Sequence, residues 1–362
     1  MRTILLKFTA FFVLALFISS CDDWTETESL HINEADVKKD NPELYKEYLE
    51  NLRKYRNLDH MLTYVWFDNN NAKTPASRGE HINVVPDSVD VISLLHPDNL
   101  NERELKEIDE VRERGTKVIY TISFSNIEVL YKAKVDSEPA PEKGSESGED
   151  EGEGEEPEPE VDGFLAFCAE YMDYNLSLVS KFNYDGLAVY YEGKLPNHMQ
   201  EEEKAIYFAR QEAFMSKVRA WVADKGDKMF VFEGKPQNLV DKSVLEQTSY
   251  IVLREFAATS GDAFDFAMRM AGVDGVPTDR YILAVSAIPL DPNDKNTGRF
   301  VDSSNKPTIP AITGAADWIA SYYGKPRLGL GIYNVQYDFY NTKQIYQYTR
   351  EAISTMNPAP KN

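Results

Sequence analysis

Aromatic, acidic and basic side chains stand at the C-terminal ends of short apolar segments throughout the sequence. Aromatic rings stack on the faces of sugar rings, and carboxylate, amide and guanidinium groups hydrogen-bond to hydroxyls. Brought together, such side chains would bind a polyhydroxylated ligand. The residues that we predict to bind it are Trp66, Tyr190, Tyr191, Glu233, Arg254, Tyr333 and Asn334. Other polar residues at these ends are Asp68, Glu192, Lys235, Glu255 and Gln336.

The segments that must position these side chains alternate with amphipathic helical stretches between residues 59 and 357. The predicted strands are 62–67, 89–95, 117–124, 185–191, 229–233, 250–256, 281–288 and 327–335, and the predicted helices are 100–114, 164–182, 201–225, 262–271, 311–323 and 343–356. The strands are short, almost continuously apolar and rich in branched residues, which is typical of parallel strands buried on both faces. Eight strands alternating with helices predict an α/β fold, a (β/α)8 TIM barrel.

A doubly wound open sheet is the competing architecture. That fold usually carries a glycine-rich phosphate-binding turn after its first strand. Here the first predicted strand is followed by Asp-Asn-Asn-Asn at 68–71, so we favour the barrel. In a barrel the C-terminal strand ends form one functional face, which would gather the polar and aromatic side chains named above.

The fourth predicted strand carries a motif with a recognisable pattern. Residues 182–192 read FNYDGLAVYYE. This segment resembles the strand-four motif of glycoside hydrolase family 18, Asp-Gly-x-Asp-x-Asp-x-Glu. Asp185, Gly186 and Glu192 match, whereas Ala188 and Tyr190 replace the two inner aspartates. The resemblance implies a barrel like those of chitinases and endo-β-N-acetylglucosaminidases, with an N-glycan or chitooligosaccharide that contains N-acetylglucosamine as its ligand.

The replaced aspartates bear on catalysis. In the family, the final Glu is the general acid and the acetamido oxygen of the substrate is the nucleophile. The Asp two residues earlier orients that acetamido group and stabilises the charge that develops on it. Strand residues two apart face the same side, so Tyr190 would occupy that place beside Glu192. A neutral phenol cannot supply the charge, and losing such stabilisation typically costs about 10² to 10⁴ in rate.

The resemblance therefore implies a catalytically degenerate member that binds glycan without cleaving it, and it leaves three alternatives open. One is an active endo-β-N-acetylglucosaminidase in which Glu192 is catalytic and Glu233 or Asp68 supplies the missing acid. Another is a surface structural or adhesion protein without a carbohydrate site. Separately, Glu233 and Arg254 could form an ion pair at the barrel mouth that binds no ligand. The last is a different barrel hydrolase.

The N-terminus has the pattern of a lipoprotein signal peptide over residues 1–20. Arg2 and Lys7 accompany an apolar run at 8–18 that is too short to span a bilayer. The Ile-Ser-Ser-Cys segment at 18–21 has the form of a lipobox and predicts a lipid on Cys21. Acidic residues at 22–28 resemble the surface-export tag of Bacteroidota lipoproteins. We expect a surface-exposed outer-membrane lipoprotein that is held to the membrane by that lipid. Residues 21–58 would form a tether and lead-in to the barrel. We expect a glycan transporter complex of the outer membrane as a partner.

Composition excludes other classes of protein. The formal net charge is −21, and residues 136–160 contain twelve acids and one base. That polar composition predicts a disordered insertion at 135–161, and the overall acidity argues against nucleic-acid binding.

Cys168, the other cysteine, is expected in the core, so no intramolecular disulfide is expected. No His or Cys pair has metal-ligand spacing, and we expect neither metal nor cofactor. Residues 291–310 are predicted to form a long loop.

Overall fold

The computed structural model describes residues 37–70, 74–137, 162–301, 306–322 and 329–358. The chain divides into a short N-terminal unit, Met1–Tyr48, and a barrel unit, Leu49–Asn362. The helices α2 (Val37–Asp40) and α3 (Pro42–Arg56) stand at the start of the described chain, and α3 continues into the barrel unit. Cys21, the predicted signal peptide and the acidic residues 22–28 lie outside the described residues.

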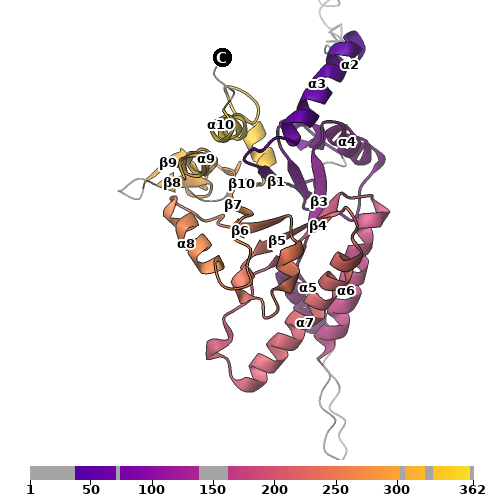
Figure 1. Cartoon of the computed structure of the whole chain (residues 1–362), viewed down its shortest axis with the longest axis vertical. Helices are drawn as coiled ribbons and strands as arrows, with labels where there is room; N and C mark the ends of the chain where they lie inside the picture. Colours follow the sequence, from indigo (N-terminus) through magenta and orange to yellow (C-terminus); the bar gives the residue numbers. More distant parts are fainter. Residues whose placement is uncertain (1–36, 71–73, 138–161, 302–305, 323–328, 359–362) are drawn as a thin grey trace, which may run out of the picture. The chain divides into compact units, whose positions relative to one another are not determined.

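Eight parallel strands close into a barrel in the order β1-β10-β7-β6-β5-β4-β3-β2 (Figure 1). Their bounds are β1 (Thr63–Phe67), β2 (Val91–Leu94), β3 (Lys117–Ser123), β4 (Gly186–Tyr191), β5 (Met229–Gly234), β6 (Tyr250–Arg254), β7 (Tyr281–Ser286) and β10 (Gly329–Tyr333). Each lies within one of the predicted strand segments or extends it by one residue. The predicted (β/α)8 barrel is therefore confirmed.

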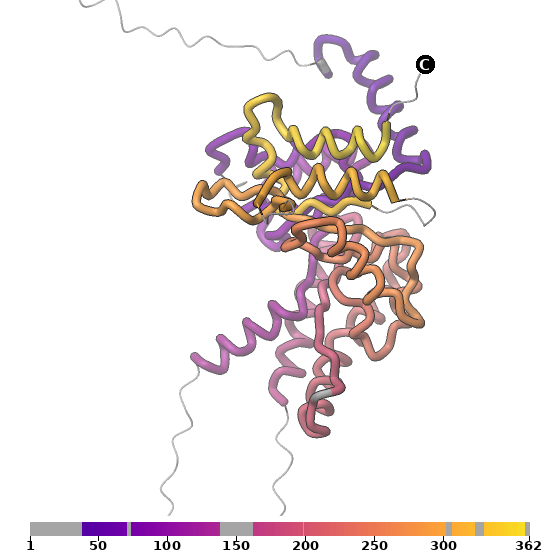
Figure 2. The backbone as a smooth tube through the Cα atoms, turned by 90° about the vertical axis from the view of Figure 1, so that its left-hand side faces the viewer, coloured from indigo at the N-terminus to yellow at the C-terminus, as the bar shows by residue number. Residues whose placement is uncertain are grey.

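The six predicted helices are present as α4 (Glu102–Glu113), α6 (Gly163–Lys181), α7 (Glu201–Asp224), α8 (Asp262–Ala271), α9 (Ala311–Ser321) and α10 (Gln347–Met356). Figure 2 shows α9 and α10 packed side by side. The sequence did not predict α3 or α5 (Phe124–Ser137), and α5 makes residues 135–137 helical instead of disordered. The remainder of the acidic insertion lies outside the described residues. Within the described ranges, no helix combines the length and apolarity needed to cross a membrane.

Residues 291–310 are not a loop throughout, as the sequence predicted. They contain an antiparallel hairpin of β8 (Arg299–Val301) and β9 (Pro307–Pro310). Phe300 is buried and its ring centroid lies 6.1 Å from that of Phe264 on α8. Besides proline, the segment has only Phe300, Val301 and Ile309 as apolar residues, which is too weak a pattern to indicate strands. The contact of Phe300 with α8 is one that the sequence pattern does not reveal.

Side chains of the barrel strands alternate between two apolar cores. The inner core fills the barrel and consists of Tyr64, Trp66, Val91, Ile119, Ala188, Val231, Val252, Ile282 and Ala284. The outer core lies between the strands and the helices and includes Leu253 of β6, Ala267 of α8 and the fully buried Cys168, as predicted for that cysteine. Because both strand faces are covered, the strands are apolar without alternation.

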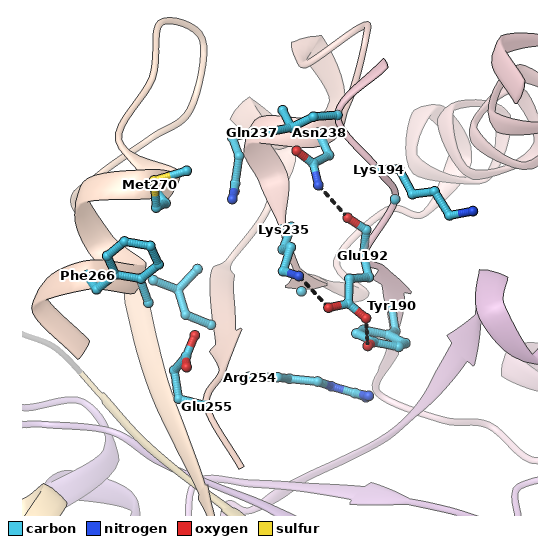
Figure 3. Close-up of a pocket in the computed structure, with 15 residues that line it drawn as sticks. Tyr190, Glu192, Lys194, Lys235, Gln237, Asn238, Arg254, Glu255, Phe266 and Met270 are labelled. Carbon is cyan, nitrogen blue, oxygen red and sulfur yellow. Dashed lines mark hydrogen bonds and ion pairs between the residues drawn. The ribbon is translucent and has the colours of Figure 1, made fainter. Parts of the chain in front are cut away.

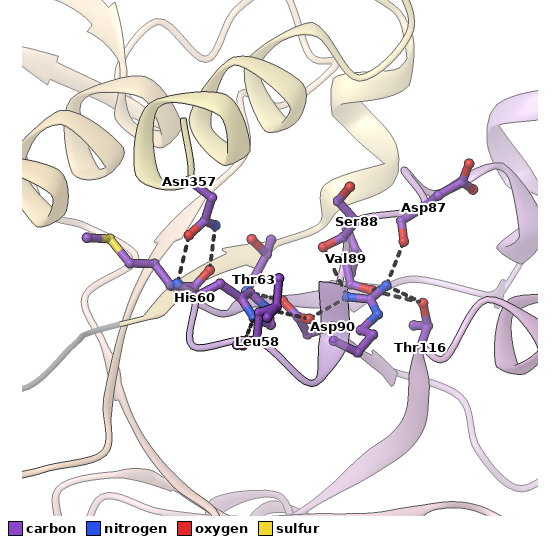
Figure 4. Close-up of polar contacts among 11 residues, drawn as sticks. Leu58, His60, Thr63, Asp87, Ser88, Val89, Asp90, Thr116 and Asn357 are labelled. Carbon is purple, nitrogen blue, oxygen red and sulfur yellow. Dashed lines mark hydrogen bonds and ion pairs between the residues drawn. The ribbon is translucent and has the colours of Figure 1, made fainter. Parts of the chain in front are cut away.

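Polar contacts close the N-terminal end of the barrel (Figure 4). The carboxylate of Asp90 accepts hydrogen bonds from Arg56 at the end of α3, from His60, and from the backbone N–H of Thr63, 2.8 Å away. Asn357, after α10, exchanges two hydrogen bonds of 2.8 Å with the backbone of Met61. These contacts join the first and last elements of the barrel.

His60 should make stability depend on pH. Nδ1 lies 2.8 Å from the carbonyl oxygen of Leu58 and Nε2 lies 2.9 Å from Oδ1 of Asp90, so only the imidazolium donates to both. The hydrogen bond to Asp90 is the main cause that raises the pKa of His60 above its ordinary value. The stabilisation is therefore fully present below the unfolded pKa of about 6.5 and is lost as the pH rises through the folded pKa.

We expect His60→Gln to be less stable than the wild type by about 1 kcal/mol at about pH 5.5, because a neutral donor replaces a charged one. The difference should be smaller at about pH 8.5, because the wild-type imidazole loses its proton as the pH rises through its folded pKa. Urea denaturation of both proteins at the two pH values measures it. The same difference at both pH values would show that His60 is not charged in the folded protein.

Candidate functional site

Tyr190 and Glu192 lie on the same side of the chain at the end of β4, as the spacing predicted. The hydroxyl of Tyr190 donates a hydrogen bond to Oε2 of Glu192 at 3.0 Å. The other carboxylate oxygen, Oε1, accepts from the ammonium of Lys235, which follows β5 (Figure 3). Asn238, in the short 3-10 helix η5 (Pro236–Asn238), donates to the backbone oxygen of Glu192 at 2.8 Å. Both oxygens of this carboxylate are thus bound before any ligand arrives.

These contacts give Glu192 the wrong electrostatics for a general acid. The hydrogen bond from Lys235 is the main cause that lowers the pKa of Glu192, and Tyr190 contributes in the same direction. A general acid that works near neutral pH needs a raised pKa so that it carries a proton to donate. Burial, followed by the charge of Glu192, raises the pKa of Tyr190, so its phenol stays neutral. The pair is a carboxylate beside a neutral hydrogen-bond donor.

Glu233 does not face the ligand, contrary to the sequence prediction. Its side chain has no exposed surface, and Oε1 accepts hydrogen bonds from the Tyr64 hydroxyl at 2.8 Å and the Thr121 hydroxyl at 2.9 Å. Oε2 accepts from Arg254. A buried carboxylate with both oxygens bound can neither reach a substrate nor supply the missing acid. The alternative prediction of a Glu233–Arg254 ion pair is confirmed.

Arg254 is surrounded by aromatic rings at the mouth of the barrel. Its guanidinium carbon lies 3.9 Å from the ring centroid of Tyr190, 5.4 Å from that of Trp66 and 5.5 Å from that of Phe256. These are distances at which a cation attracts the face of an aromatic ring. Together with its ion pair, they hold Arg254 beside Tyr190, where the family motif has an aspartate.

Trp66 was predicted to stack on the ligand, but its side chain has no exposed surface. It packs edge to face against Phe256 and Tyr333, whose rings are stacked on each other with centroids 4.5 Å apart. These rings close the barrel axis above the inner core. Tyr333 and Asn334 are half-buried on this side of the molecule, but neither lines the pocket described below.

Tyr191 was predicted to bind ligand, and the strand alternation makes that prediction wrong. It points away from the barrel interior, is fully buried, and packs against Phe124 with ring centroids 5.1 Å apart. Its hydroxyl lies 2.7 Å from that of Tyr207 and accepts from Gln211, both on α7. Tyr191 therefore anchors α7 to the barrel.

Asp68 and Gln336 were named as polar residues at strand ends, and Asp68 was the second candidate for the missing acid. The carboxylate of Asp68 lies 3.2 Å from Nε2 of His96. Its backbone N–H donates to the side-chain oxygen of Gln336 at 3.3 Å. Neither residue lines the pocket, so the structure places no acid from this strand beside Glu192.

A pocket of about 370 Å³ opens beside Glu192. Its lining residues are Tyr190, Glu192, Gly193, Lys194, Leu195, Gly234, Lys235, Gln237, Asn238, Leu253, Arg254, Glu255, Phe266, Ala267 and Met270. The sequence pointed to Tyr190, Glu192, Lys235, Arg254 and Glu255 from their positions at strand ends. It missed the residues contributed by η5 and α8, because the strand-end rule ignores side chains that later turns bring back over the barrel. Within the described ranges, no cluster of three or more His, Cys, Asp or Glu side chains could hold a metal ion.

The turn after β5 requires a glycine. Gly234 has φ +107°, and a Cβ there would lie 2.4 Å from the backbone oxygen of Tyr191. The close approach lets the backbone N–H of Lys235 donate to that same oxygen at 2.9 Å. This turn places the Lys235 ammonium against Glu192.

An eight-stranded parallel barrel with a glutamate at the end of its fourth strand defines a glycoside-hydrolase-like TIM barrel. The chain belongs to glycoside hydrolase family 18, since the family model described as "Glycoside hydrolase family 18, BT1044-like" matches residues 25–355. A comparison with curated protein sequences found no match.

Solved structures show the same fold at low sequence identity. A selenomethionine Glu-to-Gln variant of BT1044 is 16% identical, with a TM-score of 0.56 over 89% of this chain and 95% of that one. The endo-β-N-acetylglucosaminidase of Cordyceps militaris is 15% identical, with a TM-score of 0.57 over 86% of this chain and 95% of that one. A double variant of the Cordyceps militaris enzyme, bound to fucosyl-N-acetylglucosamine-Asn, has a TM-score of 0.56 at 15% identity, again over 86% of this chain and 95% of that one.

Proposed function

We propose that this protein is a non-catalytic glycan-binding lipoprotein of the cell surface, which holds N-acetylglucosamine-containing glycans for uptake. The observation that carries the proposal is the state of Glu192. Its carboxylate is bound by Lys235 and Tyr190, and its pKa is lowered where a general acid needs a raised one. No second carboxylate stands on β4, since Ala188 and Tyr190 replace both inner aspartates.

The ligand class is inferred from the family and from the pocket. The Cordyceps militaris enzyme is an endo-β-N-acetylglucosaminidase, and its double variant binds fucosyl-N-acetylglucosamine-Asn. For this chain we propose a glycan of the same class, an N-glycan or chitooligosaccharide. The mixture of aromatic, amide and charged side chains around the pocket supports a polyhydroxylated ligand.

We further propose that a lipid on Cys21 anchors the protein in the outer membrane with the barrel outside the cell. The apolar run at 8–18 and the Ile-Ser-Ser-Cys segment at 18–21 support the proposal. A protein placed there could pass glycan to an outer-membrane transporter complex. Incorporation of labelled palmitate into the wild type but not into Cys21→Ser would test the anchor.

A paired assay of cleavage and binding tests the proposal. The wild type and Glu192→Gln are each incubated with a high-mannose N-glycoprotein, and released glycan is measured by mass spectrometry. We expect release by the wild type to be no greater than release by the variant. Binding to an immobilised glycan of the same type should differ by roughly fivefold or less, because a half-exposed ion pair contributes less than about 1 kcal/mol.

Two outcomes contradict the proposal in different ways. Glycan release by the wild type that Glu192→Gln abolishes would establish the active endo-β-N-acetylglucosaminidase. No retention of either protein on any N-acetylglucosamine-containing glycan would favour the structural or adhesion protein.

A further inference from the structure

The pocket beside Glu192 lies off the barrel axis. Two of its lining residues, Leu253 of β6 and Ala267 of α8, belong to the outer core between strands and helices. No member of the inner core lines it. The stacked rings of Phe256 and Tyr333, which do not line the pocket, pack on the inner core instead, and Glu233 has no exposed surface. The pocket therefore lies between the ends of β4, β5 and β6 and the helix α8.

One wall of the pocket is apolar and exposed. The exposed fractions are 60% for Phe266 and 40% for Met270, both on α8. Figure 3 shows the ring of Phe266 and the side chain of Met270 on α8, facing the residues of β4 and β5 across the pocket. An exposed aromatic ring at the rim of a polar pocket is suited to stacking against the apolar face of a sugar.

The pocket also contains a carboxylate, that of Glu255, which lies on the same side as Phe266 in Figure 3. Lys235 is paired with Glu192 and Arg254 with Glu233, and the ammonium of Lys194 points away from the pocket (Figure 3). Among the described residues, no side chain or backbone group forms a hydrogen bond or ion pair with the half-buried carboxylate of Glu255. On η5, Oε1 of Gln237 is buried without a hydrogen-bond partner in the described structure.

We infer, resting on the proposed function, that this off-axis pocket binds a neutral sugar of the glycan and discriminates against acidic sugars. Phe266 stacks on the sugar face, and Glu255 accepts hydrogen bonds from its hydroxyls. A sialic or uronic acid would bring a second carboxylate against Glu255, and like charges in a partly desolvated site repel. Burial also raises the pKa of Glu255, the sign of a poorly solvated carboxyl that a ligand hydroxyl would stabilise.

Calorimetric titration with two matched probes tests this inference. The probes are a biantennary N-glycan without sialic acid and the same glycan with sialic acid on both branches. We expect the wild type to bind the neutral glycan about tenfold more tightly, and Glu255→Gln, which keeps the size and loses the charge, to narrow that preference to about threefold or less. Phe266→Ala should weaken binding of the neutral glycan about tenfold.

Two further variants locate the ligand. Tyr174, on α6, is 51% exposed and far from the lining residues in sequence, so Tyr174→Ala is the matched control for loss of an exposed ring. Its affinity should stay within about twofold of the wild type. Tyr333→Ala tests the barrel axis. Loss of binding in Tyr333→Ala together with wild-type affinity in Phe266→Ala would place the ligand on the axis and overturn the inference.

Failure of the inference and failure of the proposed function give different results. One outcome is that the wild type binds the neutral glycan while neither Phe266→Ala nor Glu255→Gln changes the affinity or the preference for the neutral glycan. In that case the assignment of the ligand to the off-axis pocket is wrong, and the proposed glycan-binding function stands. If the wild type binds neither glycan, both are overturned.

Discussion

Replacing Arg254 with methionine should destabilise the fold by about 3–5 kcal/mol, because it leaves the buried carboxylate of Glu233 without a counter-ion. Glu233 has no exposed surface, and only the neutral hydroxyls of Tyr64 and Thr121 would remain as its partners. Methionine has a similar length and can pack against Trp66 and Phe256, so lost packing contributes little. Urea denaturation followed by circular dichroism measures the change.

Two controls separate the buried charge from other effects. Lys217→Met breaks an ion pair with Asp173 whose side chains are 33% and 62% exposed, and should cost less than about 1 kcal/mol. The double variant Glu233→Gln with Arg254→Met carries no unpaired charge and should recover most of the lost stability. A cost for Arg254→Met no larger than that for Lys217→Met would show that Glu233 does not depend on this pair.

Replacing Gly186 with alanine should cost about 3 kcal/mol or more and should reduce the yield of folded protein. A Cβ at this position would lie 2.0 Å from the backbone oxygen of Met229 and 2.7 Å from its backbone carbon. The two residues are opposite each other in the β4–β5 pairing, so relief requires the strands to separate. No rotation of a side chain can remove an overlap with backbone.

Gly226→Ala is the matched control for Gly186→Ala. Gly226 has φ +57°, and a Cβ there would meet nothing within 4 Å, so the alanine should cost only the left-handed backbone penalty of about 1–2 kcal/mol. The denaturant midpoint of Gly226→Ala measures the cost of backbone strain alone. The midpoint of Gly186→Ala measures backbone strain together with the overlap of the Cβ with the backbone of Met229. Equal costs would show that β4 and β5 can move apart without penalty at Gly186.

The role of Gly186 changes how the strand-four motif is interpreted. Asp185, its neighbour, accepts hydrogen bonds of 2.9 Å from Nε of Arg112 and from the backbone N–H of Val118. These contacts fasten α4 and β3 to the start of β4. Two of the three matching motif positions are therefore required by the barrel itself. The match identifies the family and its fold, and only Glu192 relates to activity.

The fold was predictable because its determinants are local. Each barrel strand is a short apolar run, and the helices that separate most of the strands leave few topologies. Elements with weak local patterns escaped prediction. In α5, only Phe124 and Ile127 are buried, and in the β8–β9 hairpin Phe300 supplies most of the apolar contact.

The sequence by itself determined that Tyr190 and Glu192 share a side at the end of β4 and that no aspartate accompanies them, because side-chain direction alternates along a strand. The same rule places Tyr191 on the other face, where the structure buries it. Only the tertiary structure decided which charges remain free for a ligand. The carboxylate of Glu233 accepts hydrogen bonds from the hydroxyls of Tyr64 and Thr121, which are 169 and 112 residues away in the chain. Such contacts arise from closure of the barrel, which no local pattern encodes.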